Sequence, residues 1–338
     1  MAQQTTRITT DVDFEKDGVQ LGMLRVPHSR NSSAWGMILV PIVVIKNGEG
    51  PTLLLTAGAH GDEFEGPIAL SKLGRALDPA DVRGRLIILP AMNIPGIRAC
   101  QRICPVDGRD LNRTFPGRRD GSFTEMLAHY VSYVLVPMAD AVVDFHSGGY
   151  SLDFSPCVIM HHLDDPARHR RTMEAMVAFG APLGIVIREL DDSGQLDTFV
   201  ENAGKLFLST ELSGGSSVSI DALRMAERGI WNLLAHLELI AADHPKVSGG
   251  RTERLVEVPH QDAYVVAPEE GVYEPFVDLG DAVKQGEKVG QVHILTNPTR
   301  APVILEAGQD GVLIAKRSPG KTEAGDSLAV VAHEYTPN

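Results

Sequence analysis

The 338-residue sequence has few cysteines, no dense run of basic residues and no long apolar segment. Three cysteines are too few for a disulfide framework, so we expect buried thiols in a reducing compartment. A formal net charge of −13 argues against a nucleic-acid-binding surface. No segment approaches the roughly 20 apolar residues of a membrane span, and the N-terminus has no apolar core typical of a signal peptide. We therefore expect a soluble, cytoplasmic protein that binds neither nucleic acid nor membrane.

What the sequence does contain suits a globular protein with two domains. The hydrophobic content of 43% is sufficient for a sizeable core. A polar segment at 243–254, with one proline and two glycines, is typical of a linker. Residues 1–248 are expected to form the first domain, with a β-rich segment at 1–50. Residues 255–335 have the glycine-punctuated pattern of a small all-β domain.

Short apolar strands alternate with helical patterns in the first domain. Strands are predicted at 52–57, 85–90, 141–145 and 206–210, and helices at 66–77, 124–137, 168–180 and 220–241. This alternation predicts a mostly parallel sheet flanked by helices. A proline at position 41 in the β-branched run 37–46 predicts an edge strand or a bulge. The long segment 91–123 is rich in charged and turn residues, which is typical of a functional loop.

Chemically apt side chains follow three of the predicted strands. His60 and Glu63 come after the first, His146 after the third and Glu211 after the fourth. In an open parallel sheet, functional groups gather at the carboxyl ends of the strands. Two histidines and one carboxylate are the ligand set of a hydrolytic zinc site, and a further glutamate can accept a proton from water. Singly, His146 could be a strand-end histidine and Glu211 a helix-capping acid, but the joint pattern favours a metal site.

Four motifs occur in a fixed order along the chain. They are Gly-Ala-His60-Gly-Asp-Glu63, Asp-Leu-Asn112-Arg113-x-Phe-Pro-Gly, Asp-Phe-His146-Ser-Gly-Gly and Thr-Glu211-Leu. Over about residues 30–245, the chain resembles the succinylglutamate desuccinylase and aspartoacylase family of the zinc carboxypeptidase clan. The resemblance implies a zinc-carboxypeptidase-like fold and one Zn²⁺ per subunit, held by His60, Glu63 and His146, with Glu211 as the general base.

The resemblance also implies which residues hold the substrate. Asn112 and Arg113 would clamp its carboxylate, and an arginine fork suits this task because it matches a carboxylate through two hydrogen bonds. In the family, the arginine that polarises the scissile carbonyl lies about nine residues after an asparagine that follows the second strand. That count reaches Arg102 here. Arg98 and Arg109 are nearby alternatives.

Three further stretches, 27–36, 61–70 and 183–192, are similar to family members that deacetylate N-acetyl-2,4-diaminobutyrate in ectoine breakdown. The similarity implies a deacetylase of a small N-acyl amino acid. The amine of such a substrate would need an acid, and the candidates, which could equally form a solvated face, are Glu189, Asp191, Asp192 and Asp197. Alternative substrates are N-acetylaspartate, N-succinylglutamate or short peptides. The pair His161-His162 is a weaker candidate for a second metal site, because it has no clear third ligand.

The C-terminal segment is similar to the β-appendage of the family, which resembles biotinyl and lipoyl domains. Its lysines lie outside the turn motif that carries a cofactor in such domains, so a carrier or purely binding role is disfavoured. The lysines nearest to such a position are Lys284, Lys288, Lys316 and Lys321. We expect this segment to cover part of the active-site mouth and to support a homo-oligomer.

Overall fold

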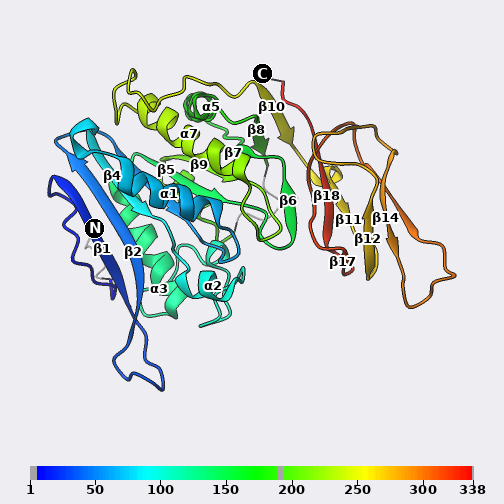
Figure 1. The fold of residues 1–338 in the computed structure, drawn as a ribbon, viewed down its shortest axis with the longest axis horizontal. Coiled ribbons are helices and arrows are strands. Elements are labelled where there is room, and N and C mark those ends of the chain that lie inside the picture. Colours follow the sequence, from blue (N-terminus) through cyan, green and yellow to red (C-terminus); the bar gives the residue numbers. More distant parts are fainter. Residues whose placement is uncertain (1–5, 189–192, 337–338) are drawn as a thin grey trace.

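A fourteen-stranded sheet runs through the molecule, and a separate four-stranded sheet lies at its C-terminal end (Figure 1). The computed structural model describes residues 6–188 and 193–336. In chain order, the strands are β1 (Gly18–Pro27), β2 (Met37–Asn47), β3 (Thr52–Ala57), β4 (Gly84–Leu89), β5 (Ala141–His146), β6 (Leu152–Phe154), β7 (Cys157–His161), β8 (Leu183–Ile187), β9 (Leu206–Glu211), β10 (Arg254–Val258), β11 (Tyr264–Val266), β12 (Gly271–Pro275), β13 (Ala282–Val283), β14 (Lys288–His293), β15 (Val303–Glu306), β16 (Gly311–Arg317), β17 (Lys321–Thr322) and β18 (Ser327–Glu334).

The centre of the large sheet is parallel, as the alternation of strands and helices predicted. Strand β3 lies between β4 and β5, and β5 pairs with β9, all in parallel. Every residue of β3 and β5 is buried, because helices cover both faces of the sheet. Beyond β9, the strand β7 runs antiparallel to β9 and parallel to β8, so the sheet is mixed. The predicted fold class is therefore confirmed.

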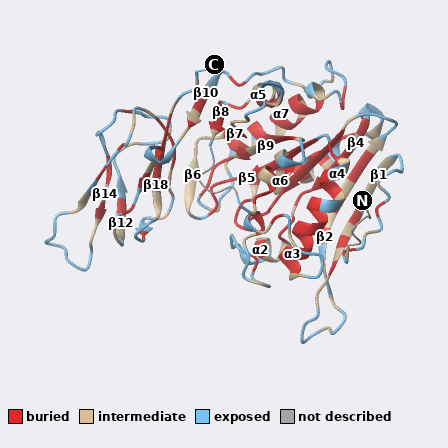
Figure 2. Ribbon diagram, turned by 180° about the vertical axis from the view of Figure 1, so that it is seen from behind, coloured by how far each residue is buried: buried red, intermediate tan, exposed pale blue. Residues whose placement is uncertain are grey.

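Helices pack on both faces of this sheet (Figures 1 and 2). The helices are α1 (Glu65–Ala76), α2 (Ile94–Ala99), α3 (Phe123–Tyr130), α4 (Val136–Met138), α5 (Pro166–Phe179), α6 (Leu196–Asn202) and α7 (Ile220–His236). One core cluster joins α1, α5 and α7 to the sheet, and the other joins α3 and α6 to its opposite face. Gly229 of α7 presses against the ring of Phe179, where a Cβ would come within 2.2 Å of a ring carbon. This close approach explains a glycine in the middle of a helix.

Pro41 does not mark an edge strand, and its register with β1 is unbroken, so neither alternative predicted from the sequence, an edge strand or a bulge, is correct. Strand β2 lies between β1 and β4, and β1 forms the edge of the sheet. The ladder with β4 begins only at Val43, so Pro41 lies beyond that pairing and is opposite Met23 of β1. The missing N–H of Pro41 is tolerated in an interior strand because one neighbour ends before reaching it.

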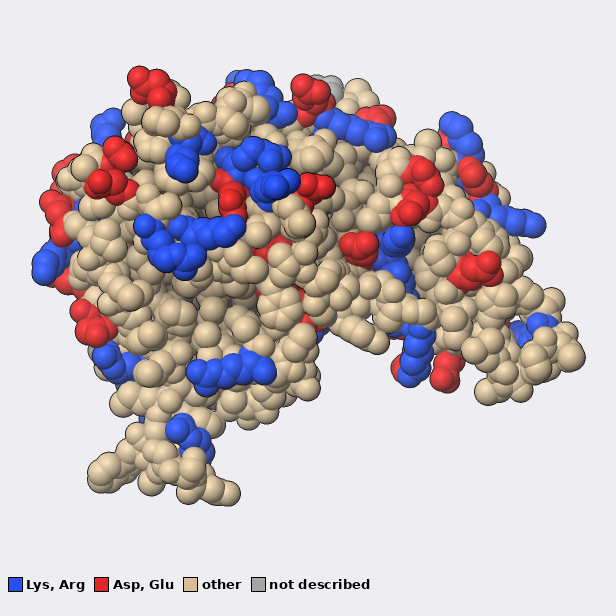
Figure 3. Space-filling view, in the orientation of Figure 1, with Lys and Arg blue, Asp and Glu red and all other residues tan. Residues whose placement is uncertain are grey.

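The C-terminal part of the chain is joined to the large sheet. Strand β10 pairs with β8 in parallel and with β18, while β6 pairs with β16. The small sheet has the order β15-β14-β12-β17. The surface is hollowed between the main body and this C-terminal end, and acidic and basic side chains are interspersed over the face in Figure 3. Within the described ranges, no helix has the length and apolar character needed to cross a bilayer. The domain limits at 248 and 255 stay a prediction.

Candidate active site

Side chains from three parallel strands meet at the carboxyl edge of the large sheet. His146 is the last residue of β5 and pairs directly with Glu211, the last residue of β9. His60 and Glu63 lie in the loop between β3 and α1. One ligand atom from each of His60, Glu63 and His146 lies within 4.8 Å of the other two, and all three residues are buried. The three proposed metal ligands therefore converge.

Glycines allow the loop after β3 to turn sharply and to pack tightly. Gly58 has a φ of +68°, in the left-handed region that favours glycine. Gly61 touches the backbone of α2, where an added Cβ would lie 1.9 Å from the carbonyl carbon of Gly96. The side chain of Asn93 donates to Ala59 O and accepts from Gly96 N, which ties α2 to the same loop. Helix α2 thus packs against the loop that carries His60 and Glu63 and supports it.

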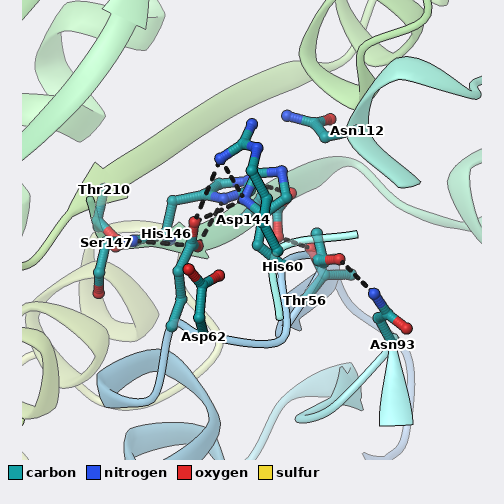
Figure 4. A network of polar contacts seen from close by, with 12 residues as sticks. Thr56, His60, Asp62, Asn93, Asn112, Asp144, His146, Ser147 and Thr210 are labelled. Carbon is teal, nitrogen blue, oxygen red and sulfur yellow. Dashed lines mark hydrogen bonds and ion pairs between the residues drawn. The ribbon is translucent and has the colours of Figure 1, made fainter. Parts of the chain in front are cut away.

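His60 and His146, both labelled in Figure 4, turn the same ring atom, Nδ1, toward Glu63. Nδ1 of His60 lies 2.6 Å from Glu63 Oε1, and Nδ1 of His146 lies 3.0 Å from Glu63 Oε2. Each Nε2 faces a different carboxylate: Asp110 Oδ1 at 3.2 Å from His60, and Asp144 Oδ2 at 2.9 Å from His146. A metal-ligating histidine usually has its other ring nitrogen held by a carboxylate or carbonyl. The donor set therefore fits a divalent cation bound through both Nδ1 atoms and the Glu63 carboxylate.

Opposite charges within this buried cluster control its titration. Burial alone would lower the pKa of His60 and His146, but the neighbouring carboxylates outweigh it, so the pKa of each imidazole is raised. Burial alone would raise the pKa of Glu63, but the two imidazoles outweigh it, so that pKa is lowered. A carboxylate kept ionised between two histidines is suited to a cation.

Asp110 and Asp144 were not assigned a role from the sequence. The sequence could have predicted a contact between Asp144 and His146. Asp144 lies two residues before His146 on the same strand, so both side chains are on the same face of the sheet. Asp110 begins the Asp-Leu-Asn-Arg motif, but its contact with His60 joins residues 50 positions apart. Only the folded chain shows that contact.

Replacing Asp144 by asparagine should weaken metal binding by ~10- to 100-fold, because the second carboxylate orients the imidazole and raises its basicity. The measurement is a competition titration with a metallochromic chelator. Thr56→Val, which removes one hydrogen bond to Asp144 Oδ1 at 2.8 Å but leaves the carboxylate in place, should weaken metal binding less. Equal metal affinity in Asp144→Asn and the wild type would contradict a role for Asp144 in orienting the His146 imidazole.

Glu211 lies beside the triad in an unusual electrostatic setting. Burial, together with the nearby charge of Glu63, raises the pKa of Glu211 above its ordinary value. Its Oε2 atom is buried and has no hydrogen-bond partner within the described part of the chain. A buried carboxylate oxygen with no partner is costly unless a ligand or reacting group completes it. The position and the raised pKa both suit a group that exchanges protons.

The structure separates the three candidate arginines. Arg102 lines the same cavity as the triad, with Nη1 3.4 Å from His60 Nδ1 and Nε 3.2 Å from Asp110 Oδ2. Arg109 lies 3.5 Å from Glu125 at the start of α3. Arg98 lines a different pocket, between β2 and α2. Of the three, the geometry favours Arg102 as the group next to a reacting carbonyl.

Asn112 and Arg113 form a short 3₁₀ turn on the wall of the cavity. Asn112 Oδ1 accepts from the N–H of Leu196 at the start of α6, which leaves the amide nitrogen as the group that can donate. Arg113 donates to the backbone oxygen of Asn112. Gly194 has a φ of +77° and packs against the backbone of Arg113, so the two loops support each other.

The cavity that contains the triad has a volume of about 300 Å³, the size of a small-molecule site. It combines the polar groups above with aliphatic side chains from β7 and β8. The C-terminal part of the chain supplies one wall, through Val258, Tyr264, Ile314, Ser327 and Val330. Of the four acids expected near the substrate amine, Asp197 lines this cavity. Glu189, Asp191 and Asp192 lie outside the described residues.

Glu65 is the first residue of α1 and is fully buried, so it does more than complement the helix dipole. Its carboxylate accepts from Ser147 Oγ at 2.8 Å, from Ser213 Oγ and from Ser219 N at 3.0 Å. Ser147 follows the ligand His146, and Ser213 lies two residues after Glu211. Glu65 therefore fastens the β3, β5 and β9 loops together.

Replacing Glu65 by alanine should lower the free energy of unfolding by about 2 kcal/mol or more, because three buried donors lose their acceptor. Denaturant unfolding measures this loss. Glu65→Gln should lose less, since the amide oxygen in the place of Oε1 can still accept from Ser213 Oγ and Ser219 N, while the Ser147 hydroxyl can rotate to accept from the amide nitrogen. A Glu65→Ala variant as stable as the wild type would show that these bonds contribute nothing net.

Comparisons with known proteins agree with this geometry. The model of the succinylglutamate desuccinylase/aspartoacylase catalytic domain matches residues 49–237. An N-alpha-acetyl-L-2,4-diaminobutyric acid deacetylase from Halomonas elongata is 46% identical over 335 residues, covering 98% of this chain and 96% of that protein. A product-bound structure of the ectoine utilization protein EutE (DoeB) from Ruegeria pomeroyi has a TM-score of 0.93 and 41% identity, covering 98% of this chain and 99% of that one.

A succinylglutamate desuccinylase/aspartoacylase structure from Rhodobacter sphaeroides is equally similar, with a TM-score of 0.92 and 45% identity, covering 98% of this chain and all of that one. The matched family region, residues 49–237, contains both histidines and both glutamates of the site as well as Asn112 and Arg113. The expected resemblance is thereby confirmed, and the chain belongs to the succinylglutamate desuccinylase/aspartoacylase family of metallohydrolases.

Proposed function

We propose that this protein is a zinc-dependent amide hydrolase that converts Nα-acetyl-L-2,4-diaminobutyrate to diaminobutyrate and acetate. The observation that carries the proposal is the full-length similarity to the Halomonas deacetylase, combined with the buried His60, Glu63 and His146 cluster. Two histidines and a carboxylate that line a cavity are typical of catalytic rather than structural zinc sites. One Zn²⁺ per chain is part of the proposal.

Zn²⁺ at this cluster would polarise the amide carbonyl and lower the pKa of water to about 7. The chain's own groups then supply the proton transfers. Glu211 accepts the proton of the attacking water and returns it to the leaving amine, a role supported by its place opposite His146 and by its buried Oε2 atom, which has no partner among the described residues. Arg102 stabilises the negative charge that develops on the carbonyl oxygen.

Substrate orientation falls to Asn112 and Arg113. Their side chains line the cavity, and a guanidinium with an adjacent amide donor matches the α-carboxylate of an amino acid. Holding the carboxylate fixes the acetylated α-nitrogen relative to the metal cluster. Such positioning lowers the activation barrier because the reacting groups no longer have to find each other. Aliphatic side chains of β7 and β8 exclude water around the substrate.

A substrate panel tests the function. The zinc-loaded protein is assayed with Nα-acetyl-2,4-diaminobutyrate, N-acetylaspartate, N-succinylglutamate and short peptides. We expect the highest kcat/KM with the first. Preference for one of the next two would reassign the protein to another acyl amino acid of the family, and preference for peptides would indicate a carboxypeptidase. Turnover of none of them would refute the hydrolase proposal.

The expected cytoplasmic homo-oligomer belongs to the same proposal. Four large apolar side chains lie exposed on one face of the outer hairpin β1–β2: Val19, Leu21, Met37 and Leu39. Trp35, in the loop of that hairpin, is 95% exposed. Several exposed apolar side chains on one face of an outer hairpin support self-association. Light scattering of the purified protein gives the oligomeric state.

A further inference from the structure

An acidic wall faces the same cavity as the metal cluster. His161 ends β7, and Asp197 and Glu201 lie one turn apart on α6, so both acids face the imidazole. Nδ1 of His161 is 2.8 Å from Glu201 Oε2, and its Nε2 is 3.9 Å from Asp197 Oδ2. All three side chains are nearly nine-tenths buried. Two acids therefore lie against one imidazole on this wall.

Asp197 is the member of this group that a ligand can reach directly. It lines the cavity together with His161, whereas Glu201 lies behind the imidazole. Oδ1 of Asp197 accepts from both the N–H and the hydroxyl of Thr198, which fixes the carboxylate at the start of α6. The other oxygen, Oδ2, is the one on the His161 side.

Glu201 adds a second carboxylate beside His161. Its Oε1 atom is buried and has no hydrogen-bond partner among the residues described. Arg168 donates to the backbone oxygen of Glu201, not to its carboxylate. Burying acid without full compensation is costly, and a cation bound nearby lowers that cost.

The cavity therefore carries charges of both signs. Besides Glu63 and Glu211 of the metal-cluster side, Arg102 and Arg113 line it with positive charge, and Asp197 lines it with negative charge. We propose that Asp197 binds the cationic amine of the substrate, with His161 and Glu201 as positioning residues behind it. The proposed function supplies the identity of that amine, the 4-amino group of the diaminobutyrate chain. The same wall repels the second carboxylate of N-acetylaspartate or N-succinylglutamate, so it sets specificity within the family.

The experiment measures binding rather than turnover, so that it stands apart from the proposed function. Calorimetry with the zinc-loaded protein compares 2,4-diaminobutyrate with 2-aminobutyrate, which has the same carbon chain without the second amine. We expect the wild type to prefer diaminobutyrate by ~10- to 100-fold, the value of one charge-assisted hydrogen bond. Asp197→Asn should remove most of this preference while leaving the affinity for 2-aminobutyrate unchanged.

Asparagine is the matched substitution because it keeps an oxygen for the Thr198 contacts and removes only the charge. Glu201→Gln should reduce the preference less than Asp197→Asn, and Asp197→Glu should restore part of it. The inference is overturned if the wild type shows no preference, or if Asp197→Asn retains it. Retained preference together with efficient deacetylation of Nα-acetyl-2,4-diaminobutyrate would refute the amine site alone. Preference for the diamine with no deacetylation would refute the proposed function alone.

Discussion

Glu211→Gln is expected to lower kcat by ~10²- to 10⁴-fold while the metal stays bound, because glutamine cannot accept the proton that general base catalysis transfers. The two side chains have nearly the same shape, so packing at the end of β9 is preserved. Glu211 lies next to the metal cluster but is not one of its three members. The measurements are kcat with Nα-acetyl-2,4-diaminobutyrate and zinc content by elemental analysis.

The matched control is Glu174→Gln on the exposed face of α5, which should keep wild-type activity. Two results would contradict the assignment of Glu211. Full turnover in Glu211→Gln would show that another group takes the proton. Loss of zinc from that variant would show that Glu211 acts as a ligand, and its role would have to be reassigned.

The metal site was predictable because each part of it has a local signature. Fully buried strands such as β3 and β5 can be recognised in the sequence as short apolar runs. The residue after such a run lies at the carboxyl edge of the sheet. His60, Glu63, His146 and Glu211 could thus be placed at one edge from the order of the strands. Their meeting required only that the sheet be parallel, which the alternation with helices indicated.

Other parts of the site depend on tertiary contacts that have no local signal. Counting residues could not separate Arg102 from Arg109, whereas the structure shows Arg109 beside Glu125. The pairing of β7 between β9 and β8 brings His161 opposite α6. The sequence between His161 and Asp197 contains no signal that predicts this contact. Asp197 could therefore be named as an acid near the substrate, but not with its partners His161 and Glu201.

Glu63→Ala should abolish metal binding, because the carboxylate bridges the two imidazoles from the centre of the cluster. Its two oxygens lie 2.6 Å and 3.0 Å from the Nδ1 atoms of His60 and His146. Without Glu63, only the two histidine ligands remain, with their imidazoles held by Asp110 and Asp144. Two histidines alone bind Zn²⁺ too weakly to retain it through purification. We expect kcat/KM to fall by at least ~10³-fold, because metal catalysis supplies several kcal/mol.

Thermal unfolding gives a readout of metal binding that does not depend on activity. A cation at 1,000 times its dissociation constant stabilises a folded protein by ~4 kcal/mol, so zinc should raise the Tm of chelator-stripped wild type by several degrees. Glu63→Ala should show no such rise, whereas Glu227→Ala, which removes an exposed partner of Lys72, should respond like the wild type. Because the cluster is the only close set of three such ligands among the described residues, an undiminished zinc response in Glu63→Ala would place the metal elsewhere and remove the basis of the proposed chemistry.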